Sequence, residues 1–304
     1  MYDIIIIGGG AAGMTAALYA LRNGKSALVV EKQGFGGQIT HSPKVENYPG
    51  TLQMSGNEFA DRMLDQILKQ GAEIELETAI SVEDLGGHKR VRTEEGGLFE
   101  GRAVILATGV KHRMLGLEGE EELIGEGISF CAVCDGDFYS GQRVCVAGGG
   151  NSALQEAVLL SDKCAEVVIL QDLPQLTGEQ RLRDALAARA NVRVVCDTKI
   201  NRLLTEDGAL RGVEIESRTT GEAREIPCDG LFVAIGLIPE NGPFAALADL
   251  NEWGYFDSDE RCLTRTPGVF VAGDCRAKGV RQLTTAVADG ATAALAACRY
   301  IDDI

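Results

Sequence analysis

Two cysteines three positions apart are the residues of this chain most able to do chemistry. Cys131 and Cys134 lie in the segment Ser-Phe-Cys-Ala-Val-Cys-Asp-Gly, and Asp135 follows the second cysteine directly. A pair at this spacing can close a small ring disulfide, and a helix N-terminus or a nearby proton acceptor can lower the pKa of one thiol. The segment therefore predicts a redox-active dithiol, with Cys131, Cys134 and Asp135 as candidate catalytic residues.

The competing interpretation of this pair is half of a zinc site. Zinc needs further cysteine or histidine ligands, but the sequence has no second C-x-x-C, and His41, His88 and His112 lack finger-like spacing. The other seven cysteines are isolated in sequence, and most cysteines of a cytoplasmic protein are small buried hydrophobic residues. We expect no metal.

A glycine turn near the N-terminus predicts a dinucleotide site. Gly8, Gly10 and Gly13 form the pattern G-x-G-x-x-G between an apolar strand and a helix, the context that this fingerprint requires. Gly8 allows the tight turn, Gly10 lets the backbone approach a pyrophosphate, and Gly13 lets helix and strand pack closely. The helix N-terminus then faces the phosphates. Glu31 ends the next strand, where a carboxylate can accept hydrogen bonds from an adenosine ribose.

A second glycine turn, in the G-x-G-x-x-A form, opens another strand–helix unit. Its functional interpretation is a second dinucleotide, a nicotinamide, and the alternative is a relic domain that only docks a protein or covers the cofactor of the first site. The candidate nicotinamide residues, if the site is used, are Gly148, Gly150, Asn151, Ser152, Ala153, Asp172 and Gly236.

The strand end after this second turn argues against NADPH. A 2′-phosphate needs Arg or Lys there, whereas an acid suits the 2′-hydroxyl of NADH. The chain places Gln171 and Asp172 at this point. The alternative is that Arg181 or Arg183 returns to the phosphate, although both arginines lie in a segment that we expect to be the helix Gly178–Ala190.

The two glycine turns belong to a domain-sized repeat. In the first unit we expect a helix Ala11–Asn23 and a strand Ala27–Val30, and in the second a strand Val144–Ala147, a helix Ser152–Ser161 and a strand Val167–Leu170. Three later apolar strands end in glycine: Ala103–Gly109, Leu231–Gly236 and Val269–Gly273. The repeat predicts an α/β fold of two Rossmann-like dinucleotide-binding domains, the second inserted into the first. The predicted ranges are 1–112 and 242–304 for the first domain and 113–241 for the inserted one.

Bulk composition narrows the function classes. The formal charge is −16, which argues against nucleic acid as a partner because its backbone requires a basic surface. Met1–Ile7 has no basic region ahead of a long apolar stretch, so we expect no signal peptide. Apolar runs end well before membrane-spanning length. These features predict a cytoplasmic protein without membrane attachment.

Taken together, these motifs resemble bacterial thioredoxin reductase of the low-molecular-weight type, over nearly the whole chain. C-A-V-C-D inside the nucleotide domain is the most specific element, since related ferredoxin:NADP reductases with the same domains lack the cysteine pair. Several further segments resemble flavin contacts of that family: Gly36-Gly37-Gln38, Val45–Gly50, Ala107-Thr108-Gly109, Gly273-Asp274 and Arg281-Gln282-Leu283.

The resemblance implies FAD as cofactor and assigns residues to it. Asp274 would contact the ribityl chain, and the helix Gln282–Ala297 would begin near the flavin pyrimidine ring, where its positive end favours a reduced, anionic flavin. The remaining implied FAD residues are Gly8, Gly10, Gly13, Glu31, Gly37, Gln38, Asn47, Thr108, Gly109, Gly273, Arg281, Gln282 and Leu283.

The same resemblance assigns roles to the dithiol. Cys134 would face the flavin, Cys131 would attack the disulfide of a partner, and Asp135 would act as the acid–base group. It also implies a homodimer, thioredoxin or a similar redoxin as partner, and rotation of the inserted domain between flavin and partner.

Two departures from the family pattern bear on electron donor and partner. NADPH-dependent members carry His-Arg-Arg plus a further arginine, where this chain has Gln171-Asp172-Leu173. Asp137 replaces the first residue of an aromatic pair that grips thioredoxin, leaving Phe138 and Tyr139. We therefore favour NADH over NADPH, or neither. The alternatives are a ferredoxin-linked enzyme independent of pyridine nucleotide, a small-molecule dithiol oxidase, and a non-enzymatic flavin redox sensor.

Overall fold

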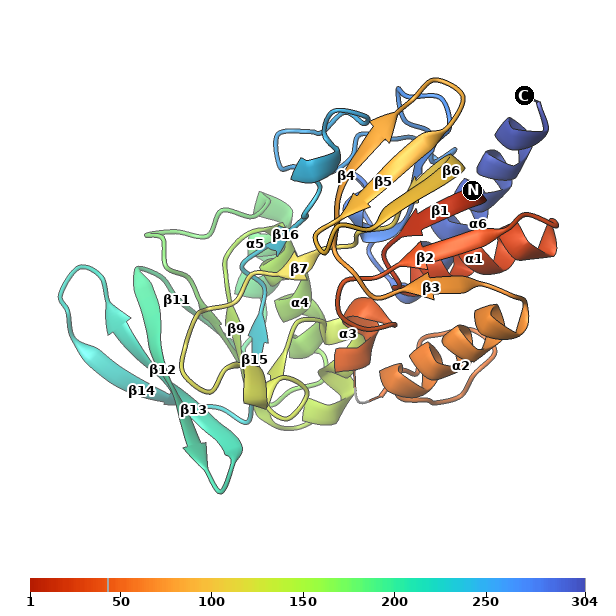
Figure 1. Ribbon diagram of the computed structural model, residues 1–304. Coiled ribbons are helices and arrows are strands. Elements are labelled where there is room, and N and C mark those ends of the chain that lie inside the picture. Colours follow the sequence, from red (N-terminus) through yellow and green to blue (C-terminus); the bar gives the residue numbers. More distant parts are fainter. Residues whose placement is uncertain (43, 304) are drawn as a thin grey trace. The chain divides into compact units, whose positions relative to one another are not determined.

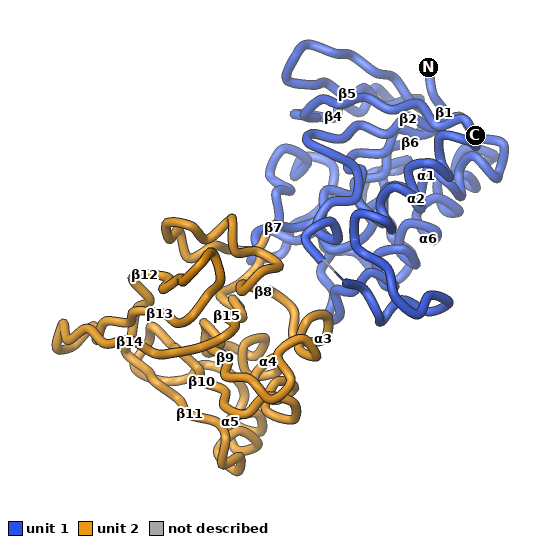
Figure 2. The backbone as a smooth tube through the Cα atoms, turned by 90° about the horizontal axis from the view of Figure 1, so that it is seen from below, with its two compact units in different colours: residues 1–111, 238–304 blue, residues 112–237 orange. Residues whose placement is uncertain are grey.

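The computed structural model describes residues 1–42 and 44–303, and the chain forms two compact units (Figure 2). Unit 1 comprises residues 1–111 and 238–304, and unit 2 comprises residues 112–237. Unit 2 is thus an insertion between two parts of unit 1. The chain crosses through β7 (Lys111–His112) and β16 (Leu237–Ile238), which pair with each other.

The second boundary differs from the sequence prediction, which assigned residues 238–241 to the inserted domain. The structure places them in unit 1 because the buried Asn241 is bonded there. Its side-chain amide donates to Gly254 O at 2.9 Å and Cys275 O at 3.0 Å, and its carbonyl accepts from Thr108 Oγ1 at 2.8 Å.

Unit 1 is a seven-stranded sheet with helices packed on it (Figure 1). The strand order is β3-β2-β1-β6-β5-β4, and β17 also pairs with β6. The strands around β1 are parallel, whereas β5 pairs antiparallel with β4 and β6. The elements are β1 (Tyr2–Ile7), α1 (Ala11–Arg22), β2 (Ala27–Val30), α2 (Gly56–Lys69), β3 (Glu73–Glu75), β4 (Ala79–Asp84), β5 (Lys89–Thr93), β6 (Leu98–Leu106), β17 (Val269–Val271) and α6 (Leu283–Asp302).

Unit 2 repeats this plan on a smaller scale. Its sheet has the parallel order β11-β10-β9-β15-β8, and a separate antiparallel sheet has the order β12-β13-β14. The elements are β8 (Ile128–Ser129), α3 (Ala132–Asp135), β9 (Arg143–Ala147), α4 (Asn151–Ser161), β10 (Glu166–Leu170), α5 (Gln180–Ala187), β11 (Val192–Val195), β12 (Thr198–Glu206), β13 (Ala209–Ser217), β14 (Ala223–Pro227) and β15 (Gly230–Val233).

The central strands of both sheets consist of continuous apolar residues because helices or loops cover both faces. In β1, Ile4–Ile7 are all buried, and the even and odd positions belong to two different core clusters. The inner strands of unit 2 divide in the same way, with Val144 and Cys145 in different clusters. This burial fixes the carboxyl ends of the strands, where both glycine turns begin.

Several predicted elements have different ends in the structure. The C-terminal helix, expected to stop at Ala297, continues to Asp302 because Cys298 and Ile301 extend its buried face. The helix expected over 178–190 is shortened to α5, since Gly178 N instead donates to Gly149 O. The strand expected to run to Gly109 ends at Leu106, ahead of the left-handed backbone at Gly109 (φ +66°).

Candidate active site

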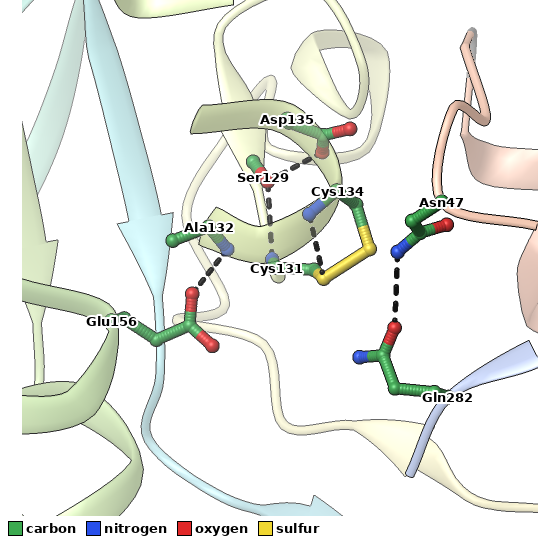
Figure 3. Close-up of a disulfide and its surroundings, with 8 residues drawn as sticks. All are labelled: Asn47, Ser129, Cys131, Ala132, Cys134, Asp135, Glu156 and Gln282. Atoms are coloured by element: carbon green, nitrogen blue, oxygen red, sulfur yellow. Dashed lines mark hydrogen bonds between the residues drawn. A yellow bond between two sulfur atoms is a disulfide. The ribbon is translucent and has the colours of Figure 1, made fainter. Parts of the chain in front are cut away.

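Cys131 and Cys134 form a disulfide at the short helix α3 of unit 2 (Figure 3). Strand β8 ends at Ser129, and Cys131 is the N-cap residue of α3. Cys134 N lies 3.2 Å from Cys131 Sγ, and Asp135 N donates to Cys131 O at 3.0 Å. The predicted cysteine pair is therefore joined within one turn of helix, next to the edge of the parallel sheet.

Asp135 is held behind this disulfide by a hydrogen-bond relay. Ser129 Oγ donates to Asp135 Oδ2 at 2.6 Å and accepts from Cys131 N at 3.1 Å (Figure 3). The other oxygen, Asp135 Oδ1, is buried without a hydrogen-bond partner. Burial raises the pKa of Asp135, and the bond from Ser129 opposes that rise. A carboxyl group in this setting retains a proton to higher pH than an ordinary aspartate.

A second acid next to the cysteine pair had no signal in the sequence. Glu156 on α4 accepts a hydrogen bond from Ala132 N, at the start of α3 (Figure 3). Burial raises the pKa of Glu156 to about 7; the bond from Ala132 lowers it and the charge of Asp135 raises it further. A glutamate in a polar–apolar helix pattern does not reveal such a contact, because only packing of α4 on α3 creates it.

The first glycine turn of unit 1 is fixed by its predicted acid. Glu31 accepts hydrogen bonds from Gly9 N at 2.6 Å and from Gln33 N at 2.9 Å. Gly36 N donates to Gly9 O at 2.9 Å, so the following loop packs on the turn. A Cβ at Gly13 would collide with Gly8 O, which is the close helix–strand contact that the fingerprint predicts.

The segment around Asp274 lies at the end of β17, within the same unit. Asp274 Oδ1 is buried and makes no hydrogen bond, although Lys278 Nζ lies 3.7 Å from it. Burial raises the pKa of this carboxyl group, and the charges of Lys278 and Arg281 oppose that rise. Gly273 N donates to Asp289 Oδ2 at 3.0 Å. Arg281 Nε donates to Asp274 O at 3.2 Å. The loop therefore holds an unsatisfied acceptor in a fixed position, which suits a hydroxyl of a ribityl chain.

The remaining predicted flavin residues also belong to unit 1. Gln282 caps α6 through Thr285, and its Oε1 accepts from Asn47 Nδ2 at 3.2 Å (Figure 3). Among the other predicted flavin residues, Gly10 forms an isolated β-bridge with Gly36, and Gly37 has a left-handed backbone (φ +64°). Gly37 and Gln38 are exposed and begin the 3-10 turn Gly37–His41. Thr108 is hydrogen-bonded to Asn241, and Leu283 is the half-buried first residue of α6.

Asp289 and Arg276 were missed by the sequence analysis. Asp289 on α6 accepts from Arg276 Nε at 3.0 Å and from Lys278 Nζ at 3.0 Å, besides Gly273 N. Its carboxylate thereby ties α6 to the Gly273–Asp274 loop. A lone acid among the small residues of this helix was the available signal.

The second glycine turn has a different supporting residue. The side chain of Gln171 packs against Gly149, in the position that Glu31 has beside Gly9 in the first turn. Thr177 N and Gly178 N donate to Gly149 O. Gly148 has a left-handed backbone (φ +122°), and Gly150 caps α4. Of the other predicted nicotinamide residues, Asn151 and Ser152 begin α4 exposed, Ala153 is buried, and Gly236 O accepts from Arg113 N at 3.0 Å.

Asp172 is exposed at the end of β10 and pairs with Arg218, whose side-chain nitrogen lies 3.5 Å away. Arg181 and Arg183, the two arginines considered as phosphate ligands, both lie on α5. Arg183 Nε is buried without a hydrogen-bond partner. Arg218 follows β13, far from Asp172 in sequence, so no local pattern could have indicated it.

Among the residues that the structure describes, no group of three or more His, Cys, Asp or Glu is arranged to hold a metal ion. Over the same residues, no helix combines the length and apolar character needed to cross a membrane.

The comparisons with known proteins agree with this geometry. The family model for pyridine nucleotide-disulphide oxidoreductase matches residues 2–290. The chain belongs to this family. A thioredoxin reductase from Listeria innocua is 38% identical over 304 residues, covering 100% of this chain and 95% of the relative. A Clostridium pasteurianum relative, named for its place as a 34.2 kDa protein in a rubredoxin operon, is 38% identical over 299 residues, covering 98% and 97%.

A solved structure supports the same assignment. The thioredoxin reductase from Streptococcus pyogenes matches with a TM-score of 0.94 and 37% identity, covering 100% of this chain and 99% of its own. This pyridine nucleotide-disulphide oxidoreductase is therefore an FAD-dependent enzyme of the thioredoxin reductase type. The buried oxygen of Asp274, which makes no hydrogen bond, and the open approach to Gly10 in unit 1 fit that cofactor.

Proposed function

We propose that this enzyme passes electrons through FAD and the Cys131–Cys134 disulfide to thioredoxin or a similar redoxin. The observation that carries the proposal is the disulfide itself, with the buried carboxyl group of Asp135 tied to it through Ser129. The names of the relatives support the redoxin as partner. When bound, FAD supplies two electrons that break the disulfide bond. A homodimer belongs to the same proposal.

The two cysteines have different roles in this scheme. Cys131, as thiolate, attacks the disulfide of the redoxin, forming a mixed disulfide and releasing one redoxin sulfur, which takes up a proton. Cys134 then attacks the sulfur of Cys131, re-forming the Cys131–Cys134 bond and releasing the second redoxin thiol. Asp135 supplies or accepts the proton in these steps, and its raised pKa keeps it protonated closer to neutral pH.

The donor half of the proposal concerns the end of β10. A 2′-phosphate would bring close to two negative charges to the exposed carboxylate of Asp172. Two like charges ~4 Å apart cost several kcal/mol at an effective dielectric constant near 20, which is a hundredfold or more in affinity. Arg218 already pairs with Asp172 and offsets part of that repulsion. We propose that NADPH is a poor donor and that NADH, or no nicotinamide, is used.

A second candidate donor is a small iron-containing electron carrier such as ferredoxin. The name of the Clostridium relative favours it, because that name places the relative in a rubredoxin operon. The carboxylate of Asp172 supports it indirectly, by arguing against NADPH. In this variant the second glycine turn is retained for the fold of unit 2 and its dithiol, while electrons reach FAD from the carrier.

Anaerobic stopped-flow reduction of the flavin separates these donors. The holoenzyme is mixed with NADPH, NADH or reduced ferredoxin, and bleaching of the flavin is followed. We expect NADPH to be the slower nucleotide. Fast saturable reduction by micromolar NADPH, equal to or better than NADH, would contradict the charge argument, whereas slow reduction by both nucleotides favours ferredoxin. Oxygen-dependent oxidation of an added small dithiol would point to a dithiol oxidase. The absence of turnover with every donor would point to a redox sensor.

Two serine variants test the dithiol roles. Cys134→Ser should remove the contact between thiolate and flavin and stop internal electron transfer. Cys131→Ser should keep that contact and lose redoxin reduction, because the attacking sulfur is gone. The flavin–thiolate absorbance and the rate of redoxin reduction report on the two steps separately. Full redoxin reduction by Cys131→Ser would show that the roles are assigned wrongly.

A further inference from the structure

Glu156 is a half-buried acid that the proposed electron path does not use. It lies on α4, which packs against α3, and its carboxylate Oε2 accepts the hydrogen bond of Ala132 N. That amide directly follows Cys131 in the chain and is the first N–H of the dithiol helix. Figure 3 shows the glutamate side chain reaching from α4 to this amide, on the side of the helix away from Asp135.

The contact changes how many free N–H donors the start of α3 presents near the sulfur of Cys131. Backbone N–H groups close to a thiolate stabilise it, and in this turn Cys134 N lies 3.2 Å from Cys131 Sγ. The N–H of Ala132 in the same turn donates to a carboxylate instead. An ionised Glu156 therefore removes a donor from the neighbourhood of Cys131 and adds a like charge there, and like charges disfavour ionisation of the thiol.

The charge of Glu156 is itself adjustable near neutral pH. Burial raises its pKa to about 7, the Ala132 amide lowers it, and Asp135 on α3 raises it. Two charged groups on the neighbouring segments have partners of their own: Asp137 pairs with Lys163 at 2.5 Å, and Glu179 bonds Asn151 at the start of α4. Arg183 lies on α5, which packs against α4, and its Nε makes no hydrogen bond. Among the described residues, Asp135 is the charged group that shifts the pKa of Glu156.

We propose that Glu156 is a positioning residue of the dithiol, which fixes the first turn of α3 and, when ionised, holds back formation of the Cys131 thiolate. When Glu156 takes up a proton this restraint is released. The inference rests on the proposed role of Cys131 as the outward-facing nucleophile, and it adds the residue that sets how readily this sulfur ionises. Glu156 neither forms nor breaks a covalent bond in the scheme.

Alkylation of the reduced holoenzyme tests the proposal without using turnover. The protein is reduced with dithionite in oxygen-free buffer and treated with iodoacetamide between pH 5.5 and pH 9. Peptide mapping by mass spectrometry then follows Cys131 separately from the other cysteines. In Glu156→Gln the side-chain oxygen still accepts the Ala132 bond while the charge is lost. We expect Cys131 of this variant to react roughly threefold to tenfold faster than wild type at pH 8.

The expected difference has a definite pH dependence. Below pH 7 the wild-type Glu156 is protonated and resembles glutamine, so the two proteins should react at equal rates near pH 5.5–6. Above pH 7 the rates should separate. Equal rates at pH 8, or the same difference at both ends of the range, would overturn the proposal, because a constant offset indicates altered structure and not charge.

Two further variants separate charge from shape. Glu156→Asp keeps a carboxylate and should stay closer to wild type than Glu156→Gln does; an equal effect of both variants would overturn the role of charge. Glu225→Gln makes the same chemical change on the exposed edge strand β14 of unit 2 and should match wild type. If Glu156→Gln does not fold, the wild-type profile decides: the restraint predicts a Cys131 titration broader than a single-group curve around pH 7.

The reduction potential of the pair gives a second, independent measurement. Releasing a thiolate stabilises the reduced form, so Glu156→Gln should shift the potential to less negative values, by about 30 mV for a tenfold change in equilibrium constant. Both readouts remain valid if the enzyme proves to reduce something other than a redoxin. If the proposed function is wrong, only the turnover assays will show it. If this inference is wrong, the alkylation rates and the reduction potential will show it.

Discussion

The two glycine turns of this chain have the same backbone plan but different side chains beneath them. In unit 1, Glu31 binds the amide of Gly9 with a carboxylate. In unit 2, the neutral Gln171 fills that position, and the nearest acid, Asp172, is exposed and paired with Arg218. The third small residue also differs, being Gly13 in the first turn and Ala153 in the second.

The comparison separates what the fold requires from what a ligand requires. Both turns need a left-handed glycine at the strand end, Gly8 and Gly148, because the chain reverses there against a neighbouring strand. The supporting side chain differs: it is a carboxylate beneath the first turn and a neutral amide beneath the second. One backbone plan thus accommodates two side chains of different charge within a single chain.

The largest effect is expected from the third position of each turn. Gly13→Ala would place a methyl group against Gly8 O, a backbone atom that cannot move aside. We expect a loss of about 3 kcal/mol or more in stability and loss of bound FAD. The matched change Ala153→Gly should cost about 1 kcal/mol, as glycine does within a helix. Flavin content and thermal unfolding measure both; a Gly13→Ala protein with full flavin content would refute the tight packing of the first turn.

The next prediction compares two aspartates, Asp274 in unit 1 and Asp135 in unit 2, each of which has a buried oxygen that makes no hydrogen bond. Asp135→Asn should slow turnover roughly a hundredfold or more while leaving FAD bound, because it removes a positioned acid–base group. Asp274→Asn should instead weaken FAD binding, measured as flavin released on dilution.

The raised pKa of Asp135 also predicts the direction in which the turnover rate changes with pH. Burial raises the pKa of Asp135, so the proton needed for its acid role is lost as pH rises through that raised value, and the wild-type rate should fall in this direction. The Asn variant should lack this limb. Wild-type turnover in Asp135→Asn would show that another group moves the proton.

A smaller effect tests the charge at the second turn. Asp172→Arg replaces the repelling carboxylate with a phosphate ligand and frees Arg218, so NADPH should bind about tenfold or more tightly relative to NADH. Fluorescence titration with each nucleotide measures the ratio. Asp162→Arg, which makes the same charge change at the other end of α4 where Asp162 pairs with Arg189, is the control. An equal gain in both variants would show that overall charge and not position is responsible.

Local sequence patterns predicted most of this architecture because they encode local physics. Apolar runs located the central strands, and glycine spacing located both turns. What they could not provide depends on packing between distant segments: the bond from Ala132 to Glu156, the pairing of Asp172 with Arg218, and the Asn241 contacts that move a unit boundary. Asp289 combines both situations. An acid among the small residues of its helix is a local signal, but its hydrogen-bond partners Gly273 and Arg276 lie on a loop outside that helix.

The paired crossings β7 and β16 set the order in which the two sites can arise during synthesis. Unit 2 is one continuous segment whose ends are joined by this small sheet, so its dithiol turn is complete once residue 238 has left the ribosome. Unit 1 must wait, because β6 pairs with β17 and α1 packs on α6 from the far end of the chain. Long-range contacts of this kind form late. The nascent protein therefore carries its cysteine turn before it has a place for the flavin.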